Sequence, residues 1–251
     1  MNYYAIGDIH GYLDILKSSM KNVHLEDNPE SKLIFLGDYI DNGPNSASVL
    51  YYIKELFERY NGQVVALIGN HEEMFLEWLL HPKEYVNYFI EDKDLNTLGT
   101  FLNKEELKEF LKRINSNNSI IEISEQVADI IKHNHKNLIV WLKKLPYYYE
   151  TEKQIFVHAG IDEETEELWK IGTAKEYFTN KFPPSTGWFY KDIIAGHVGI
   201  SSFKQKSKMK NIFYDGKSHF YIDGIDGNND KNKIIPILKY DFITKEYTTY
   251  K

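Results

Sequence analysis

The sequence predicts an α/β fold with one helical insertion. Short apolar runs recur along the chain, and five of them end in a turn that carries glycine and polar residues. Segments with helical spacing separate the first three runs, and a longer helix-rich stretch separates the third run from the fourth. Short continuous apolar runs bounded by turn residues are typical of buried strands.

The first strands alternate with helices, which is the pattern of βαβ units with a parallel sheet. In such sheets ligands bind beyond the carboxyl ends of the strands, where the polar turns of this chain fall. We expect helices at Leu13 to Met20 and Ser46 to Tyr60. We expect strands at Tyr3 to Ile6, Lys32 to Leu36, Val64 to Ile68, Gln154 to Val157 and Asp192 to Ala195.

The pattern between the third and fourth strands is helical, and Pro146 ends it. The expected helices are Glu73 to Leu80, Lys83 to Ile90, Lys104 to Ile114 and Val127 to Leu145. Later strands are expected at Asn211 to Tyr214, Phe220 to Asp223 and Ile234 to Tyr240, with a turn at Gly224 to Asp230. No Pro- or Ser-rich linker separates these parts. We therefore expect one domain over residues 1–251, with a helical insertion at about 73–146 and a C-terminal strand and hairpin region at about 211–251.

Composition excludes several classes of protein. The 251 residues include 37 acidic and 30 basic side chains, nine histidines and no cysteine, for a formal charge of −7. The absence of cysteine excludes disulfides, thiolate nucleophiles and Cys-type metal sites. The acidic balance disfavours a generic duplex-binding protein, whose affinity depends on Lys and Arg. No apolar run has the length of a membrane span and no signal-type segment starts the chain, so we expect a cytoplasmic protein.

The strand ends supply a set of metal-binding side chains. Two carboxylates, three imidazoles and one amide suit a pair of divalent ions if one carboxylate bridges them, and Asp38 is placed to do so. Two ions about 3.5 to 4 Å apart can clamp the attacking and leaving oxygens of a displacement at phosphorus. The candidate ligands are Asp8, His10, Asp38, Asn70, His158 and His197.

Two further residues in the same turns are candidates for acid catalysis. A hydrogen bond between His71 and Asp41 would orient the imidazole and keep it protonated, which suits a general acid. Each residue also has a structural alternative. His71 could be a buried structural histidine, and Asp41 could be a turn or helix-capping residue beside Asn42-Gly43-Pro44. The remaining histidines are expected at the surface: His24, His81, His133, His135 and His219.

Taken in order, the motifs resemble those of the calcineurin-like metallophosphoesterases. The resemblance is closest to the phosphoprotein phosphatase (serine/threonine) branch in its short bacterial and phage form, which is related to symmetrical diadenosine tetraphosphate hydrolases. It extends from the first strand to about Gly224. The motifs are Gly7-Asp8-Ile9-His10-Gly11, Gly37-Asp38-Tyr39-Ile40-Asp41-Asn42-Gly43, Gly69-Asn70-His71-Glu72, His158-Ala159-Gly160 and Gly196-His197.

The resemblance implies a β-sandwich of mixed sheets flanked by helices. It further implies that a hydroxide activated by two metal ions attacks phosphorus while His71, supported by Asp41, protonates the leaving group. Members of this family usually use Mn²⁺, sometimes Fe or Zn, and an N/O donor set agrees with such ions. The implied ligands are Asp8, His10 and Asp38 for the first metal, and Asp38, Asn70, His158 and His197 for the second.

The chain departs from the family pattern at the phosphate-binding positions. Asn42 stands where the phosphatase branch has an arginine, and Ile68 stands where many members have another. The amide of Asn42 does not replace a guanidinium that binds phosphate through two hydrogen bonds. Lys170 lies near the position of another phosphate-binding arginine and could serve as a point charge. The late Ile-Asp-Thr-Gly motif lacks its threonine and reads Ile222-Asp223-Gly224.

These observations lead to a phosphomonoesterase of the serine/threonine protein phosphatase type as the first hypothesis. The alternative is a diadenosine tetraphosphate hydrolase or phosphodiesterase. Asn42 in place of the phosphate-binding arginine weakens the case for a fast monoesterase. A non-catalytic metal-binding domain is disfavoured because all the candidate ligands are present. The expected partners are a phosphorylated protein, or a phosphate ester or nucleotide, with no duplex nucleic acid, membrane or obligate protein partner.

Overall fold

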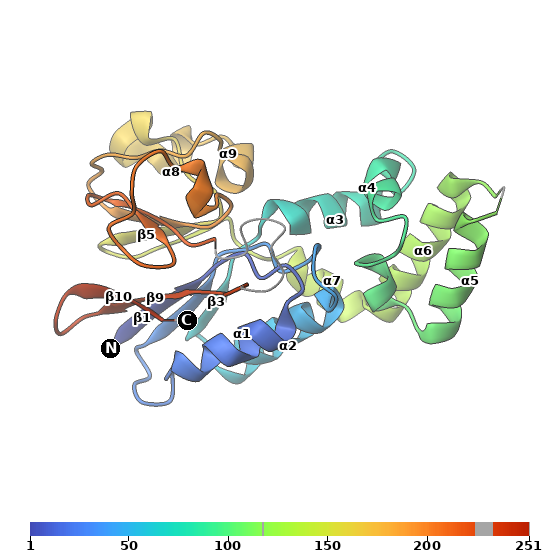
Figure 1. Ribbon diagram of the computed structural model, residues 1–251, viewed down its shortest axis with the longest axis horizontal. Coiled ribbons are helices and arrows are strands. Elements are labelled where there is room, and N and C mark those ends of the chain that lie inside the picture. The colour runs from blue at the N-terminus through green and yellow to red at the C-terminus, as the bar shows by residue number, and fades with distance from the viewer. Residues whose placement is uncertain (117, 224–232, 251) are drawn as a thin grey trace.

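The computed structural model describes residues 1–116, 118–223 and 233–250. Its strands form two five-stranded mixed sheets flanked by helices, and the helical insertion extends away from the sheets (Figure 1). The predicted fold class is therefore confirmed. Within the described ranges, no helix is long and apolar enough to cross a membrane.

The first sheet contains the N-terminal βαβ units. Its order is β10-β9-β1-β2-β3, in which β1, β2 and β3 run parallel and β9 and β10 are antiparallel to their neighbours. The crossovers contain α1 (Leu13–Ser19) and α2 (Ser46–Arg59). The strands are β1 (Asn2–Ile6), β2 (Lys32–Phe35), β3 (Val64–Ala66), β9 (Ile237–Asp241) and β10 (Glu246–Tyr250).

The second sheet has the order β4-β5-β6-β8-β7, with β5, β6 and β8 parallel. Its strands are β4 (Tyr148–Glu150), β5 (Gln154–Val157), β6 (Asp192–Ala195), β7 (Phe213–Tyr214) and β8 (His219–Tyr221). The connection from β5 to β6 includes η3 (Glu163–Leu168), α8 (Trp169–Gly172) and α9 (Lys175–Asn180).

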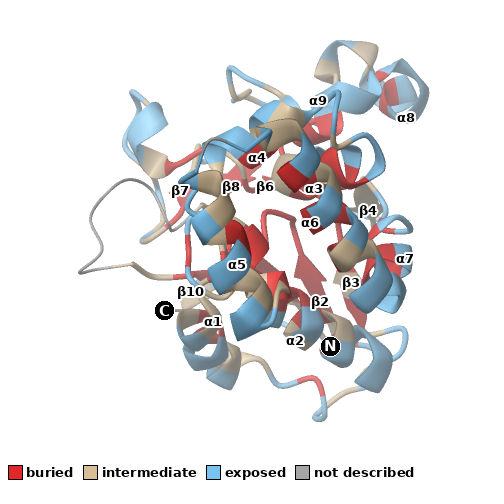
Figure 2. Cartoon of the chain, turned by 90° about the vertical axis from the view of Figure 1, so that its right-hand side faces the viewer, coloured by how far each residue is buried: buried red, intermediate tan, exposed pale blue. Residues whose placement is uncertain are grey.

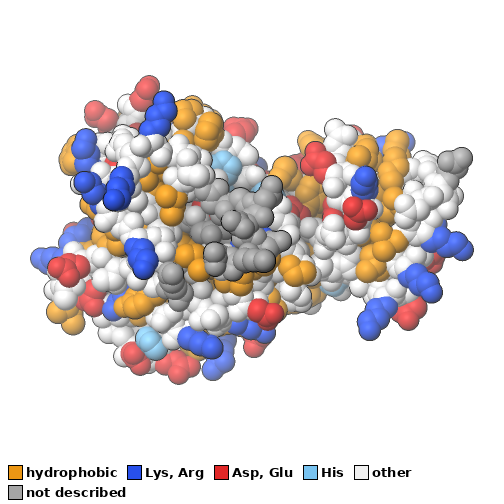
Figure 3. Space-filling view, viewed as in Figure 1, with side chains coloured by type: hydrophobic (Ala, Val, Ile, Leu, Met, Phe, Trp, Pro, Cys, Tyr) orange, Lys and Arg blue, Asp and Glu red, His pale blue; other side chains and the backbone are white. Residues whose placement is uncertain are grey.

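The two sheets share a core. Fully buried side chains from each sheet meet there, which removes apolar surface from water and holds the sheets face to face. The first sheet contributes Ala5, Ile34 and Leu36, and the second contributes Phe156, Ile194 and Phe220. On the surface shown in Figure 3, Lys and Arg side chains are interspersed with Asp and Glu.

The buried apolar side chains of the helical insertion belong to the same core cluster as those on one face of the first sheet. Its helices turn exposed faces outward and buried faces inward (Figure 2). Asn103 caps α5 by accepting from the backbone N–H groups of Glu105 and Glu106. The elements are α3 (Asn70–Leu80), α4 (Val86–Glu91), η2 (Leu98–Phe101), α5 (Lys104–Ile114), α6 (Ile120–Asn134) and α7 (Lys136–Leu142).

Several boundaries differ from the sequence-based expectation. The helix expected from Val127 begins seven residues earlier, at Ile120, because Ser119 caps it by accepting from the N–H of Glu122. It is interrupted at His135, where α7 follows. Strand β10 lies in the expected C-terminal strand and hairpin region, although no separate strand is predicted for it, and it pairs with β9 after a turn at Asp241 to Lys245. The turn expected at Gly224 to Asp230 lies outside the described residues.

The surface location expected for His219 is wrong. This side chain is fully buried in the second sheet, where Nε2 lies 3.0 Å from Oε2 of Glu163 and Nδ1 lies 3.4 Å from Oδ2 of Asp215. Lys181 completes the cluster, with Nζ 3.0 Å from Oε1 of Glu163. Burial opposes ionisation of Glu163, but His219 and Lys181 outweigh it and lower the pKa of Glu163 to about 2. The contact between Glu163 and His219 thus joins η3 to β8.

Glu163→Gln should therefore change how stability depends on pH. A depressed carboxyl pKa stabilises the folded state above the ordinary value of 4.5, and this contribution is lost as pH falls toward about 2. We expect the variant to lose about 1–3 kcal/mol of unfolding free energy at neutral pH and to have a flatter acid limb. Urea unfolding at a series of pH values measures both. Exposed Glu167→Gln is the control, and parallel curves for wild type and Glu163→Gln would contradict the expectation.

Glu72 ties the loop after β2 to the start of α3. Its side chain is fully buried and accepts four backbone hydrogen bonds. Oε1 accepts from Tyr39 at 2.8 Å and Ile40 at 3.2 Å, while Oε2 accepts from Asp38 at 2.9 Å and Gly69 at 3.1 Å. One carboxylate therefore satisfies donors from two loops that both carry predicted site residues.

Glu72→Gln keeps the shape of this side chain but replaces one accepting oxygen with an N–H donor. That donor would face backbone N–H groups, so we expect the free energy of unfolding to fall by about 3 kcal/mol. Glu77→Gln, on the exposed face of the same helix, should change it by less than about 0.5 kcal/mol. Burial raises the pKa of Glu72 to about 8, so urea unfolding at pH 9 compares the two variants with the carboxylate ionised, and equal losses would contradict the assigned role of Glu72.

Candidate active site

The polar side chains that follow the strands converge at one place. Asp8, Asp38 and Asn70 follow β1, β2 and β3 of the first sheet. His158 and His197 follow β5 and β6 of the second sheet. The site therefore forms where the carboxyl ends of the parallel strands of both sheets meet, as the strand pattern predicts.

The backbone is strained at several of these residues. Positive φ values occur at Asp8 (51°), His10 (47°), Asp38 (54°) and His197 (65°). A non-glycine residue in this conformation costs about 1–3 kcal/mol and persists only where the surrounding structure enforces it. The strain aims four chemically active side chains at the same point.

Two glycines allow the strand ends to approach. Gly37 has a φ of +107°, and a Cβ atom there would lie 2.8 Å from Nδ1 of His158. A Cβ atom on Gly69 would lie 2.3 Å from Oδ1 of Asp38. Any larger residue at either position would displace a candidate ligand.

Asp38 is the centre of the cluster. Oδ1 lies 3.4 Å from Nε2 of His158, and Oδ2 lies 3.8 Å from Nε2 of both His10 and His71. Among the described residues, two groups have ligand atoms within 4.8 Å of one another. One contains His10, Asp38 and His71, and the other contains Asp38, His158 and His197, so the groups share Asp38.

Asn70 and Asp8 complete the set of six predicted ligands. Oδ1 of Asn70 lies 2.9 Å from Nε2 of His158 and 3.2 Å from Nδ1 of His197. Oδ2 of Asp8 accepts from the backbone N–H of His197 at 2.6 Å, and Oδ1 lies 3.9 Å from Nδ1 of His158. Together with the contacts of Asp38, these distances join all six side chains into one network.

The backbone orients two of the imidazoles. Nδ1 of His158 faces the carbonyl oxygen of Leu36 at 2.9 Å, and Nδ1 of His10 faces that of Ile40 at 3.0 Å. When Nδ1 donates its hydrogen to the carbonyl, Nε2 of the same ring keeps its lone pair and lies on the side of Asp38. Histidine ligands of metal ions are typically held in this way.

The protonation states suit metal binding. Burial lowers the pKa of His158 to about 4, and it also lowers the pKa of His10 and of His197, so these rings stay neutral. Burial, together with the charges of Asp223 and Asp38, raises the pKa of Asp8 well above its usual value. Negative charge is therefore concentrated here without enough positive charge to balance it.

The residues fit divalent metal ions. Oδ1 of Asp8 is buried and accepts no hydrogen bond from the described residues, although a buried carboxylate oxygen normally has a partner. A cation would satisfy this oxygen and balance the carboxylates. Carboxylate, amide and imidazole donors without sulfur suit ions such as Mn²⁺.

His71 and Asp41 form a hydrogen-bonded pair beside the cluster. Nδ1 of His71 lies 2.6 Å from Oδ2 of Asp41. Burial works against the protonated ring, but the hydrogen bond to Asp41 and the charges of Asp38 and Asp41 outweigh it and raise the pKa of His71 to about 9. Nε2 of this protonated imidazole faces Asp38. The pair can therefore hold a proton next to the candidate metal ligands.

The two predicted substrate-binding residues have different surroundings. Nδ2 of Asn42 lies 3.3 Å from Nδ1 of His10, at the edge of the cluster. Lys170 instead forms an ion pair with Glu150 and lies 5.7 Å from the ring centroid of Trp169. None of the contacts found for Lys170 among the described residues involves the cluster.

Three residues of the site had no role in the sequence-based prediction. Glu72 stands in the Gly69-Asn70-His71-Glu72 motif, so its position is a local signal, although most of the backbone donors that it accepts from lie far away in sequence. Asp223 acts on Asp8 through its charge, and it stands in the incomplete late motif. Tyr88 donates to Asp41 from the helical insertion, and no local pattern marks it.

Curated relatives are similar to this chain at low identity. The symmetrical bis(5'-nucleosyl)-tetraphosphatase of Nitrosococcus oceani is 23% identical over 212 residues, which cover 84% of this chain and 60% of the relative. The protein of the same name from Pseudomonas syringae pv. syringae is 29% identical over 164 residues, which cover 64% of this chain and 42% of the relative. The chain thus spans less than two thirds of the length of these relatives.

Solved structures share the fold. One described provisionally as a diadenosine tetraphosphatase has a TM-score of 0.54 at 13% identity and covers 99% of this chain and 92% of its own. A mutant of a cold-active protein tyrosine phosphatase has a TM-score of 0.52 at 15% identity, with coverages of 100% and 80%. A family model described as calcineurin-like phosphoesterase matches residues 1–219, which include all six candidate ligands and the His71 and Asp41 pair. The chain therefore belongs to the calcineurin-like phosphoesterases, metal-dependent hydrolases that act on phosphoester bonds.

Proposed function

We propose that this protein hydrolyses the polyphosphate chain of dinucleoside polyphosphates, with diadenosine tetraphosphate as the representative substrate. The observation that carries the catalytic part is the position of Asp38, whose two oxygens face two groups of histidines. If each group held a divalent cation, both cations would share Asp38 and would supply activation of water and neutralisation of phosphate charge. The names of the curated relatives support the substrate class.

The ligand roles follow from the contacts. His71 lies as close to Asp38 as His10 does, but its Nδ1 is engaged by Asp41 and its raised pKa keeps the ring protonated. A protonated imidazole donates hydrogen bonds and does not bind a metal ion. We therefore assign His71 to proton transfer. The proposed ligands are Asp8, His10 and Asp38 for one ion, and Asp38, Asn70, His158 and His197 for the other.

Two divalent cations, which we propose to be Mn²⁺, would supply Lewis-acid activation of water and neutralise phosphate charge when bound. The protein itself supplies orientation and a proton. Asp41 holds Nδ1 of His71, so that Nε2 can donate the proton to the oxygen that leaves phosphorus. Burial of the pair limits competition from water for this hydrogen bond.

The substrate preference rests on Asn42 as well as on the relatives. A phosphomonoester presents a terminal phosphate with two negative charges, which an arginine binds through two hydrogen bonds. Asn42 offers one neutral amide at this edge of the cluster. A phosphate inside a polyphosphate chain carries less charge and depends less on such a contact. The dinucleotide reading is therefore favoured over the serine/threonine phosphatase reading.

One assay separates these activities. With added Mn²⁺, we expect turnover of diadenosine tetraphosphate to exceed that of a phosphoserine peptide, p-nitrophenyl phosphate and bis(p-nitrophenyl) phosphate. Removal of metal with EDTA should abolish it, and Mn²⁺ should restore it. Turnover restricted to the phosphopeptide would replace the proposal with the protein phosphatase reading. No turnover of any of the four compounds would exclude both.

A second measurement tests the proton donor. His71→Asn should reduce kcat for aryl phosphates with poor leaving groups by about 10²- to 10³-fold, because these leaving groups depend on protonation. The loss for p-nitrophenyl phosphate should be far smaller. His133→Asn, at an exposed position of α6, is the matched control and should leave both rates unchanged. Equal losses for good and poor leaving groups would remove the proton-donor role of His71.

A further inference from the structure

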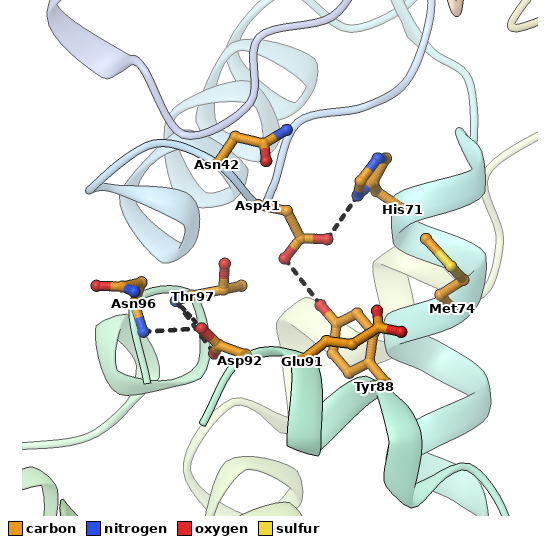
Figure 4. A pocket seen from close by; sticks show the side chains of 9 residues that line it. All are labelled: Asp41, Asn42, His71, Met74, Tyr88, Glu91, Asp92, Asn96 and Thr97. Carbon is orange, nitrogen blue, oxygen red and sulfur yellow. Dashed lines mark hydrogen bonds and ion pairs between the residues drawn. The ribbon is translucent and has the colours of Figure 1, made fainter. Parts of the chain in front are cut away.

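The helical insertion contributes one side chain to the His71 and Asp41 pair. Tyr88, on α4, donates from Oη to Oδ1 of Asp41 at 3.0 Å (Figure 4). The other carboxylate oxygen, Oδ2, is 2.6 Å from Nδ1 of His71. Both carboxylate oxygens of Asp41 therefore have a side-chain partner, one on α3 and one on α4.

Tyr88 restricts the rotation of the Asp41 carboxylate. The backbone of Asp41 is held where its N–H donates to Oγ of Ser46 at 3.1 Å. The carboxylate plane is set separately, because rotation about the bond to the carboxyl carbon has a broad energy profile. Two donors on the two oxygens restrict this rotation, whereas His71 alone restricts it weakly.

Tyr88 is itself held in place by α3. Its ring centroid lies 6.3 Å from that of Phe75 and 5.9 Å from that of Trp78, both of which are fully buried. The indole N–H of Trp78 donates to Oγ of Ser124 at 2.9 Å, which connects α3 to α6. The aromatic packing therefore aims the hydroxyl of Tyr88 at Asp41.

Tyr88 also lines the space next to the pair. A cavity of about 310 Å³ is bounded by Asp41, Asn42, His71 and Tyr88, together with residues that follow α4 (Figure 4). A neighbouring cavity of about 530 Å³ has Asn70 in its lining and shares Met74, Tyr88 and Glu91 with the first. Tyr88 thus lines both cavities, and His71 lines the first.

We propose that Tyr88 is a positioning residue for the proton donor: it orients the Asp41 carboxylate, and through Asp41 it aims the ring of His71. The inference rests on the proposed function, because it concerns the same proton transfer. It assigns the helical insertion a part in the chemistry in addition to any part in selecting substrates. Tyr88 acts through Asp41 and needs no contact with the reacting atoms.

The test uses Tyr88→Phe, which removes only the hydroxyl, in the Mn²⁺-loaded protein. For a series of aryl phosphates, we expect kcat to fall by about tenfold for phenyl phosphate and by less than about twofold for p-nitrophenyl phosphate, with KM unchanged. In the His71→Asn background the same substitution should cause no further loss, because the donor it positions is gone. Equal losses across the series, or additive losses in the double variant, would overturn the proposal.

Tyr60→Phe is the matched control. Its hydroxyl also donates to a carboxylate, Oε1 of Glu26 at 2.8 Å, but on the exposed surface at the end of α2. We expect this variant to keep the wild-type rates for all aryl phosphates. Thermal unfolding of both variants separates a loss of positioning from a loss of folding, since Tyr88→Phe should still unfold cooperatively near the wild-type temperature.

A measurement that needs no catalysis keeps the two proposals separate. The Nδ1–H proton of His71 can be observed by NMR in metal-free protein, and we expect it to exchange with water several-fold faster in Tyr88→Phe. An unchanged exchange rate would overturn the role of Tyr88 even if the enzyme is active. Faster exchange in a protein that hydrolyses no phosphate compound would sustain the positioning role and exclude the proposed function.

Discussion

The site depends on one buried carboxylate. Glu72 accepts four backbone hydrogen bonds, and through them it joins the loop that carries Asp38 and Asp41 to the helix start that carries Asn70 and His71. Burial and the charge of Asp38 raise the pKa of Glu72 to about 8. The backbone hydrogen bonds act in the opposite direction, because they stabilise the ionised carboxylate. The arrangement of donors around Glu72 thus sets the distance between the candidate metal site and the proton donor.

Charge explains how an acidic protein can act on an anionic substrate. Asp8 and Asp38 lie close together with Glu72 and Asp223 nearby, and the pKa of Asp8 is raised by burial and by its acidic neighbours. Asp38 is the exception, because the histidines around it overcome burial and lower its pKa. Two bound cations would reverse the local sign, since only two of the six proposed ligands are anionic. The net charge of −7 therefore says little about the site.

Much of this could be predicted from sequence because the ligands follow strands. A short apolar run, a glycine and a polar residue are local signals, and parallel strands bring their ends together regardless of what connects them. The features that were not predicted depend on packing between distant segments. Tyr88 donates to Asp41 from α4, which packs on α3, and the buried His219 contacts Glu163 of η3. The early start of α6 is intermediate, because its cap, Ser119, is a local signal, but a serine by itself is equally common in a loop.

The helical insertion lies between β3 and β4, and these strands belong to different sheets. The two halves of the metal-binding network are thus separated in sequence by the helical insertion, to which helices can be added without altering any strand end. Tyr88 limits that freedom, because a redesigned or shortened insertion must still deliver a donor to Asp41. The outer helix α5 could therefore be redesigned most freely, whereas α4 and α6 would have to keep their contacts with α3, through the rings of Tyr88 and Phe75 and through Ser124 and Trp78.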